Sequence, residues 1–159
     1  MAYAVRKDGA GFRAVNSPAD VLPTETFSSG VPVLPPPLVG RANEVQARRA
    51  AGGFTVNFGS SVPVLFGTDA LGLALLNGAV SRQALPNPPE TVQWQVGANE
   101  FVALTGAQVV IAGTLVADFV SDTFEVLRQV LAAIDAGTVT SLSQIDAYDW
   151  PANFAVVPA

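Results

Sequence analysis

The sequence has no cysteine and no histidine among its 159 residues. Without cysteine the chain forms no disulfide bond and offers no thiolate nucleophile or thiolate metal ligand. Without histidine it lacks the commonest general base of enzymes and the usual nitrogen ligand of transition metals. Composition alone therefore excludes several large classes of catalytic and metal sites.

Basic residues are scarce. Lys7 is the only lysine, and eight basic residues against thirteen acidic ones give a net charge of −5. The arginines are scattered and form no basic stripe of the kind that binds a phosphate backbone. We therefore expect no nucleic-acid partner.

Long apolar runs are also missing. The longest apolar segment, residues 109–134, is interrupted by Asp118, Asp122, Glu125 and Arg128, so no membrane insertion is expected. The first eight residues carry charges where a signal peptide has its apolar segment, so no signal peptide is expected. Half of the residues are hydrophobic, which is enough for the core of one domain or of a domain with an appendage.

The N-terminal segment, residues 1–30, has the pattern of a docking hairpin. Residues 3–6 and 12–15 flank an Asp8-Gly9 turn signal, which predicts a β-hairpin, and residues 21–30 are expected to be irregular or weakly extended. A lone hairpin is marginal in water, so it must pack on another structure. The prolines within residues 31–40 predict an extended, semi-rigid linker.

The first half of the domain predicted for residues 41–151 alternates helices and short strands. A helix over 38–51 ends at a pair of glycines, and strands follow at 54–58 and 62–66. Thr68 or Asp69 caps a further helix that runs to about residue 84. This helix is apolar almost all round, so we expect it to be sandwiched between other elements.

The second half begins with a hairpin that leads into a long helix near 105–136. Val92, Trp94 and Val96 share one apolar strand face, and Thr105 with Gln108 forms a capping box at the start of the helix. At roughly 48 Å the helix either kinks near Gly113 and packs on the helix predicted for residues 68–84, or projects into a partner. Its predicted apolar stripe has one gap near Thr123 and comprises Ile111, Leu115, Phe119, Val126, Val130 and Ile134.

A short helix over 141–147 and an extended tail at 152–159 complete the chain. The sequence therefore predicts an α+β fold. An N-terminal β-hairpin and an extended proline-rich strap precede a small antiparallel sheet that is packed with helices, one of them long.

Acidic residues are the only candidates for acid–base or metal chemistry. Asp118, Asp122 and Glu125 share one helix face, which suits either a metal cluster or, far more commonly, a solvated surface. Asp146 and Asp149 lie near Trp150, which suits either an aromatic sugar site or a helix end beside a core tryptophan. No phosphate-binding or dinucleotide-binding glycine motif is present. We therefore predict no enzyme activity, no catalytic or metal-binding residue and no cofactor.

Several segments of the chain occur in a recognisable order. They are Arg49, Gly53-Phe54-Thr55-Val56, Thr68-Asp69-Ala70, Leu76-Asn77-Gly78-Ala79, Val92-Gln93-Trp94, Asn99-Glu100-Phe101-Val102-Ala103-Leu104-Thr105, Phe124, Leu131-Ala132-Ala133-Ile134-Asp135-Ala136 and Trp150-Pro151. Together they resemble a small domain of unknown function found in tail proteins of bacteriophages and prophages. The resemblance covers roughly residues 41–151, and its most specific part is the tryptophan followed by the Asn-x-Phe-Val-x-Leu-Thr core.

The N-terminus carries a second resemblance. Tyr3-Ala4-Val5-Arg6-Lys7-Asp8-Gly9 and Phe12-Arg13-Ala14-Val15-Asn16-Ser17 are similar to the opening of phage tail-fibre-associated and tail-fibre-assembly proteins. These resemblances imply a structural protein of the virion, in the tail tip, baseplate or tail fibre, made in the host bacterial cytoplasm. Its expected partners are other tail proteins involved in host attachment and further copies of itself, with a trimer favoured.

Two alternatives to a structural role stay open. The first is a tail-fibre assembly chaperone that binds fibre tips during morphogenesis, which the N-terminal resemblance favours. The second is an enzyme acting on surface polysaccharide, which would depend on Asp146, Asp149 and Trp150.

Overall fold

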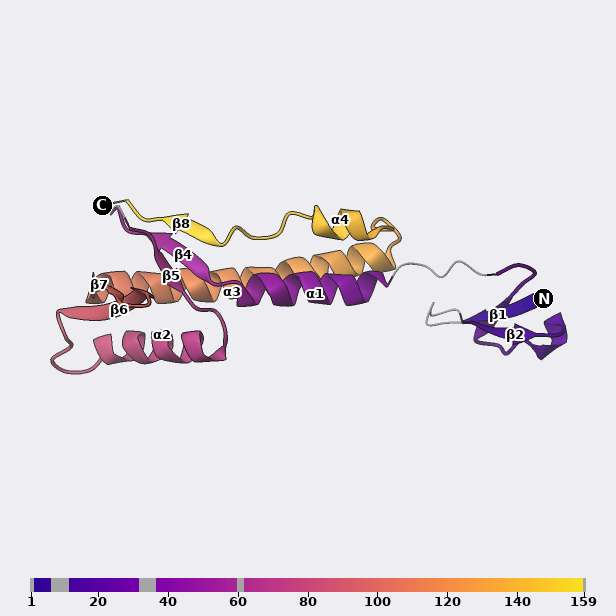
Figure 1. Ribbon diagram of the computed structural model, residues 1–159, viewed down its shortest axis with the longest axis horizontal. Helices are drawn as coiled ribbons and strands as arrows, with labels where there is room; N and C mark the ends of the chain where they lie inside the picture. Colours follow the sequence, from indigo (N-terminus) through magenta and orange to yellow (C-terminus); the bar gives the residue numbers. More distant parts are fainter. Residues whose placement is uncertain (1, 7–11, 32–36, 60–61, 159) are drawn as a thin grey trace.

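The computed structural model describes residues 2–6, 12–31, 37–59 and 62–158. The predicted turn around Asp8-Gly9, the central part of the proline-rich linker and part of the turn after the 54–58 strand lie outside the described residues. The predicted α+β fold class is confirmed, because four α-helices accompany three small sheets in the described chain (Figure 1).

The N-terminal segment forms a three-stranded antiparallel sheet. Strands β1 (Ala2–Arg6), β2 (Phe12–Val15) and β3 (Glu25–Ser28) lie in the order β2-β1-β3. The hairpin of β1 and β2 was predicted, whereas β3 lies in the stretch expected to be irregular or weakly extended. Figure 1 shows this sheet standing apart from the remaining elements.

Helix α3 (Gly106–Asp135) organises the rest of the fold. Its 30 residues span about 45 Å, and two other helices pack along it, α1 (Leu38–Ala51) on its C-terminal half and α2 (Ala70–Gln83) on its N-terminal half (Figure 1). Helix α3 runs unbroken through Gly113, so the predicted kink is wrong, whereas the packing on α2 predicted with it is confirmed. The glycine instead makes room for a neighbour, since a Cβ atom at this position would lie 2.6 Å from Val80 Cγ2.

Two sheets pack beside α3. The predicted hairpin is confirmed as β6 (Thr91–Gly97) and β7 (Glu100–Thr105). The other sheet has the order β5-β4-β8, with β4 (Phe54–Asn57) antiparallel to β5 (Val64–Phe66) and parallel to β8 (Phe154–Val156). The tail predicted for 152–159 is indeed extended, but it supplies an edge strand of this mixed sheet.

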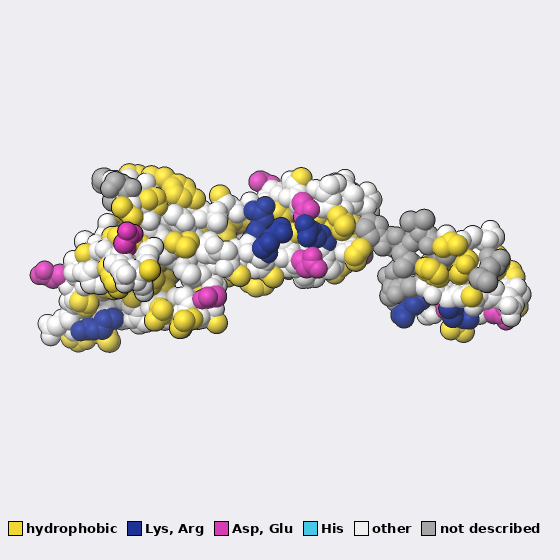
Figure 2. All heavy atoms as spheres, viewed as in Figure 1, with side chains coloured by type: hydrophobic (Ala, Val, Ile, Leu, Met, Phe, Trp, Pro, Cys, Tyr) yellow, Lys and Arg dark blue, Asp and Glu magenta, His cyan; other side chains and the backbone are white. Residues whose placement is uncertain are grey.

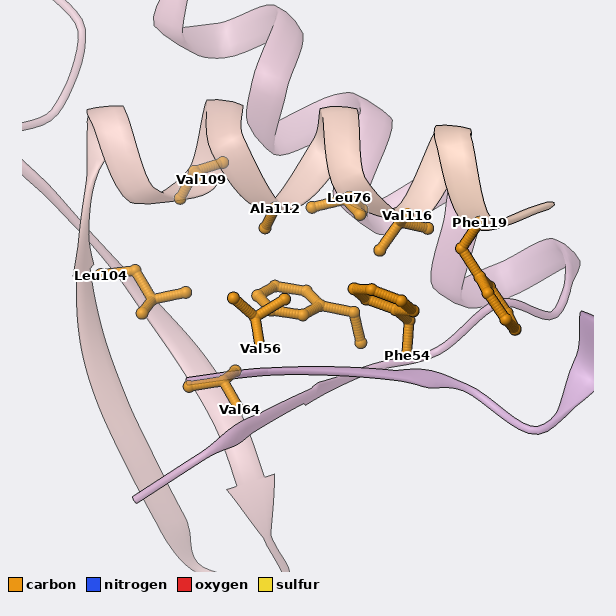
Figure 3. Close-up of a cluster of buried hydrophobic side chains, with 10 residues drawn as sticks. Phe54, Val56, Val64, Leu76, Leu104, Val109, Ala112, Val116 and Phe119 are labelled. Atoms are coloured by element: carbon orange, nitrogen blue, oxygen red, sulfur yellow. The ribbon is translucent and has the colours of Figure 1, made fainter. Parts of the chain in front are cut away.

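The first apolar core lies between the N-terminal half of α3 and the strands. Figure 3 shows Val109, Ala112, Val116 and Phe119 of α3 pointing toward the side chains of β4 and β5. The predicted helix start is also confirmed, because Thr105 Oγ1 accepts from the Gln108 amide at 3.2 Å while Gln108 Oε1 accepts from the Thr105 amide at 2.9 Å. The hairpin and the helix that follows it therefore form one packed unit.

The second core lies along the C-terminal half of α3. It joins α1, α3 and the short α4 (Leu142–Asp146) and buries six residues: Ala42, Val45, Val130, Val139, Ile145 and Trp150. Helix α3 ends where predicted, since Gly137 has a φ of 71°, a backbone conformation that glycine adopts readily. That turn sends the chain back along α1 and toward β8 (Figure 1).

The apolar stripe predicted on α3 is partly wrong. Thr123, placed in a gap of that stripe, is fully buried, whereas Ile111 is exposed. The buried positions from Val109 to Thr123 follow steps of three and four residues and Val130 lies seven residues further on, which is the spacing of packed helices. Gln46 of α1 accounts for the buried threonine, because its Nε2 donates to Thr123 Oγ1 at 3.1 Å. The buried residues of α3 are Val109, Ala112, Val116, Phe119, Thr123 and Val130.

Within the described residues, no helix combines the length and the apolar character needed to cross a membrane.

Candidate interaction surface

The acidic row on α3 is an exposed surface. Asp118, Asp122 and Glu125 are all exposed, and across the part of the chain that the structure describes no three acidic side chains are grouped to hold a metal ion. Glu125 accepts hydrogen bonds from Arg128 and from Gln129, and these bonds lower the pKa of its carboxyl to about 2. This carboxylate is ionised at neutral pH, and the neighbouring Arg128 balances its charge.

The second acidic candidate is also engaged. Asp146 takes a two-pronged contact from Arg41, with Nε at 3.0 Å and Nη2 at 2.9 Å from its two oxygens, and the hydrogen bond lowers the pKa of its carboxyl. Trp150 is buried, and its indole Nε1 donates to the Ile145 carbonyl at 2.9 Å. The indole thus packs in the second core, as a helix-end tryptophan does, while Asp149 is exposed.

Helix α2 does not match the expectation of a sandwiched helix. Leu76 is buried against α3, but Leu71 is 69% exposed and Leu75 is 59% exposed. One face of α2 fills the first core, and no other described element covers the opposite face. The start of α2 is held close to the preceding loop, because Asp69 Oδ1 accepts from the Gly72 amide at 2.6 Å.

An apolar groove runs between α2, β5 and the β6–β7 hairpin. Its volume is about 540 Å³, which falls in the range of pockets that accept a ligand or a partner's side chains. Trp94 forms one side, with its ring centroid 5.0 Å from that of Phe66 and its Nε1 3.4 Å from the Leu65 carbonyl. The lining residues carry no charge: Leu65, Gly67, Gly72, Leu75, Ala79, Val92, Gln93, Trp94, Gln95 and Phe101.

Leu65 of the groove also belongs to the outer face of the β5-β4-β8 sheet. Leu65 and Phe154 are both register partners of Thr55, so the three side chains share the sheet face that points away from the core. Figure 2 shows hydrophobic side chains at the surface over β8 and over α2. We call this surface the apolar face and define it by six exposed residues: Leu65, Leu71, Leu75, Phe101, Phe154 and Val156.

The extent of the apolar face determines what can bind there. Covering the exposed half of one such side chain contributes about 1 kcal/mol to the free energy of binding, since burying a whole apolar side chain contributes about 1.5–3 kcal/mol. All six together contribute roughly 6 kcal/mol, which only begins to offset the cost of association, about 4–15 kcal/mol. A stable partner therefore has to cover the whole apolar face and add further contacts, as a neighbouring protein chain does.

The apolar face was not predicted from the sequence. Apolar residues on α2 and on β7 were visible, but nothing in their spacing distinguishes a covered face from an open one. The signal that could have located the sheet part is the alternation of residues 154–157, in which Phe154 and Val156 point outward and Ala155 and Val157 pack on the first core.

Comparison with known proteins gives one family. The family described as a domain of unknown function (DUF4376) matches residues 37–151. No curated protein and no solved structure matches the chain.

Proposed function

We propose that this chain, which belongs to the DUF4376 family of domains of unknown function, is a structural protein of a bacteriophage tail. It holds the tail tip, baseplate or tail fibre together through protein–protein contacts. The two phage-tail resemblances of the sequence support this assignment, and the apolar face is the single structural observation that carries it.

The apolar face supports a lasting contact rather than a brief encounter. Its residues come from α2, the β6–β7 hairpin and the β5-β4-β8 sheet, which are regular elements of the fold, and Leu65 belongs both to the groove and to the outer face of that sheet. Exposed apolar patches rimmed by polar residues mark protein interaction sites. Copies of the chain itself are the partners that we favour, as a trimer, together with neighbouring tail proteins.

The N-terminal sheet supports a second attachment point. Among the described residues of 2–31 only Ala4 and Val15 are buried apolar residues, whereas Tyr3 and Phe12 meet edge to face at the surface with ring centroids 5.4 Å apart. A sheet with so small a core gains stability from docking on a neighbour.

The first test is the protein content of purified virions of the phage or prophage that encodes the chain. Quantitative mass spectrometry is expected to find the chain at a fixed copy number in mature tails. Absence from virions, together with co-purification with free fibres from infected cells, would instead identify an assembly chaperone. Absence from both would refute a role in the tail.

The second test perturbs the apolar face. Phe101→Ser removes a side chain that is 59% exposed on the apolar face, and Phe124→Ser removes one that is 56% exposed on the solvent side of α3. Light scattering after size exclusion and tail assembly in infected cells are expected to show loss of oligomers and of complete tails for Phe101→Ser alone. Equal behaviour of the two variants, both folded by circular dichroism, would contradict the assignment of this face.

A further inference from the structure

A second surface feature lies at the C-terminal end of α1, outside the apolar face. Arg48 and Arg49 line a small pocket together with Gly52, Phe119, Pro151 and Asn153. Figure 2 shows arginine side chains gathered over the middle of the molecule, where α1 lies. The pocket lies between the end of α1 and the residues that precede β8.

These two arginines form no ion pair with any described residue. In the described residues neither Arg48 nor Arg49 has a carboxylate within ion-pair distance, and the acid nearest in effect, Asp146, is already bound by the two-pronged contact from Arg41. The carbonyl end of a helix carries roughly half a negative charge. Two guanidinium groups exceed that charge, so the pocket is left with a surplus of positive charge.

Arg49 also carries an unused donor. Its Nε is shielded from solvent and has no hydrogen-bond acceptor in the part of the chain that the structure describes. Its guanidinium lies over the ring of Trp150, 5.9 Å from the ring centroid, which holds the group in place by a cation–π contact. Buried donors without acceptors are rare in folded proteins, and a guanidinium edge is the group that binds a carboxylate in two places at once.

The size and walls of the pocket define the ligand. Its volume of about 200 Å³ is below the range of about 300–1,000 Å³ for whole small-molecule sites, so it accepts one anionic group and not a cofactor. Phe119 and Pro151 supply apolar walls, and Asn153 supplies a polar side chain. A carboxylate on a short aliphatic stem satisfies both the apolar walls and the arginines.

We propose that this pocket binds a carboxylate group between Arg48 and Arg49, with their guanidinium groups donating to it and the aliphatic stem resting on Phe119. The carboxylate comes either from an acidic side chain of a partner protein or from a free organic acid. The pocket and the apolar face share no residue, so the site does not depend on the proposed role in the tail.

The test follows the two indole N–H signals by NMR in the full chain, with Trp94 as the internal reference for Trp150. The probes are sodium acetate, inorganic phosphate, N-acetylglutamate α-amide and its glutamine counterpart, each compared with sodium chloride at equal ionic strength. We expect a saturable shift of the Trp150 signal with carboxylate probes and none with the glutamine compound. Tighter binding of the glutamate compound than of acetate identifies a protein side chain as the ligand, whereas equal or tighter binding of acetate identifies a free acid.

Arginine variants distinguish specific binding in the pocket from non-specific electrostatic attraction to the protein surface. Arg48→Gln removes an exposed charge, and Arg49→Lys keeps the charge but loses the planar guanidinium that binds a carboxylate at two points. Both are expected to weaken binding about tenfold or more, since a hydrogen bond to a charged group is lost. Arg128→Gln is the control, because this exposed arginine pairs with Glu125 on α3, and it is expected to bind as the unmodified chain does.

Three outcomes would overturn the proposal. The first is the absence of a saturable Trp150 shift with any carboxylate, and the second is tighter binding of phosphate than of every carboxylate. The third is an equal loss of affinity in Arg128→Gln and in Arg48→Gln, with all variants folded by circular dichroism.

Discussion

The N-terminal sheet and the rest of the fold are stabilised in different ways. We call the rest of the fold, residues 37–59 and 62–158, the α3 body. The α3 body buries two apolar cores around one helix. The N-terminal sheet buries little and is tied across its surface by Arg13, which donates to Glu25 Oε1 at 3.0 Å, to Glu25 Oε2 at 2.9 Å and to the Asp20 carbonyl at 2.7 Å. A substitution that creates a cavity is therefore expected to destabilise the α3 body, whereas low pH is expected to destabilise the N-terminal sheet.

The largest expected effect comes from a cavity in the α3 body. Phe66 is fully buried and packs on Trp94, so Phe66→Ala should lower the free energy of unfolding of the body by about 3–5 kcal/mol. Urea denaturation followed by circular dichroism measures this loss. The amide signals of β1 to β3 should stay unchanged, and Phe101→Ala, which truncates an exposed ring, should cost less than about 0.5 kcal/mol. Loss of the N-terminal sheet in Phe66→Ala would show that the two regions are not independent.

An intermediate effect is expected at the polar contact between α1 and α3. Thr123→Val leaves the buried Gln46 side chain without its acceptor, which should cost about 1–3 kcal/mol. Adding Gln46→Leu removes the side-chain amide that has lost its hydrogen-bond partner. The double variant should therefore recover most of the lost free energy of unfolding. Denaturation curves of the two single variants and the double variant give the coupling directly. A double variant as unstable as the sum of the single variants would contradict the coupling.

The smallest effect is the acid sensitivity of the N-terminal sheet. The hydrogen bond from Arg13 holds the pKa of Glu25 below its ordinary value of 4.5, so the ionised carboxylate favours the folded sheet. Its stabilising effect is complete above pH 4.5 and is lost as the pH falls through the lowered pKa. Arg13 is half exposed, so screening by solvent limits the effect.

Hydrogen exchange of β1 amides between pH 6 and pH 2, corrected for the intrinsic exchange rate, measures this loss. Glu25→Gln is the matched control, because it has no carboxyl to protonate and should show a smaller acid response in β1. The same acid response in both chains would mean that another group governs the sheet.

The local features of the fold could be predicted from the sequence. The capping box at Thr105, the stop at Gly137 and the hairpin around Trp94 each depend on residues a few positions apart, and chemistry over so short a range can be read directly. The features that were missed depend on distant partners. Strand β3 is tied through Glu25 to Arg13, and β8 pairs with β4.

The same reason explains the errors about burial. Periodicity ranks residues by hydrophobicity, so it favoured Ile111 and skipped Thr123, whereas the fold supplies Gln46 from another helix to satisfy that hydroxyl. The uncovered face of α2 was missed because Leu71 and Leu75 have the composition of core residues. The pocket at Arg48 and Arg49 depends on Trp150 and Asn153, about a hundred positions away.

The parallel pairing of β4 with β8 affects how the chain folds during translation. The ribosome synthesises residues 54–57 about a hundred residues before residues 154–156. At about 5–20 residues per second, the edge of β4 stays unpaired for several seconds until β8 has been made. Phe154 and Val156 arrive with that neighbour and complete the apolar face. A chain interrupted before residue 154 lacks Phe154 and Val156 and therefore cannot present the complete apolar face.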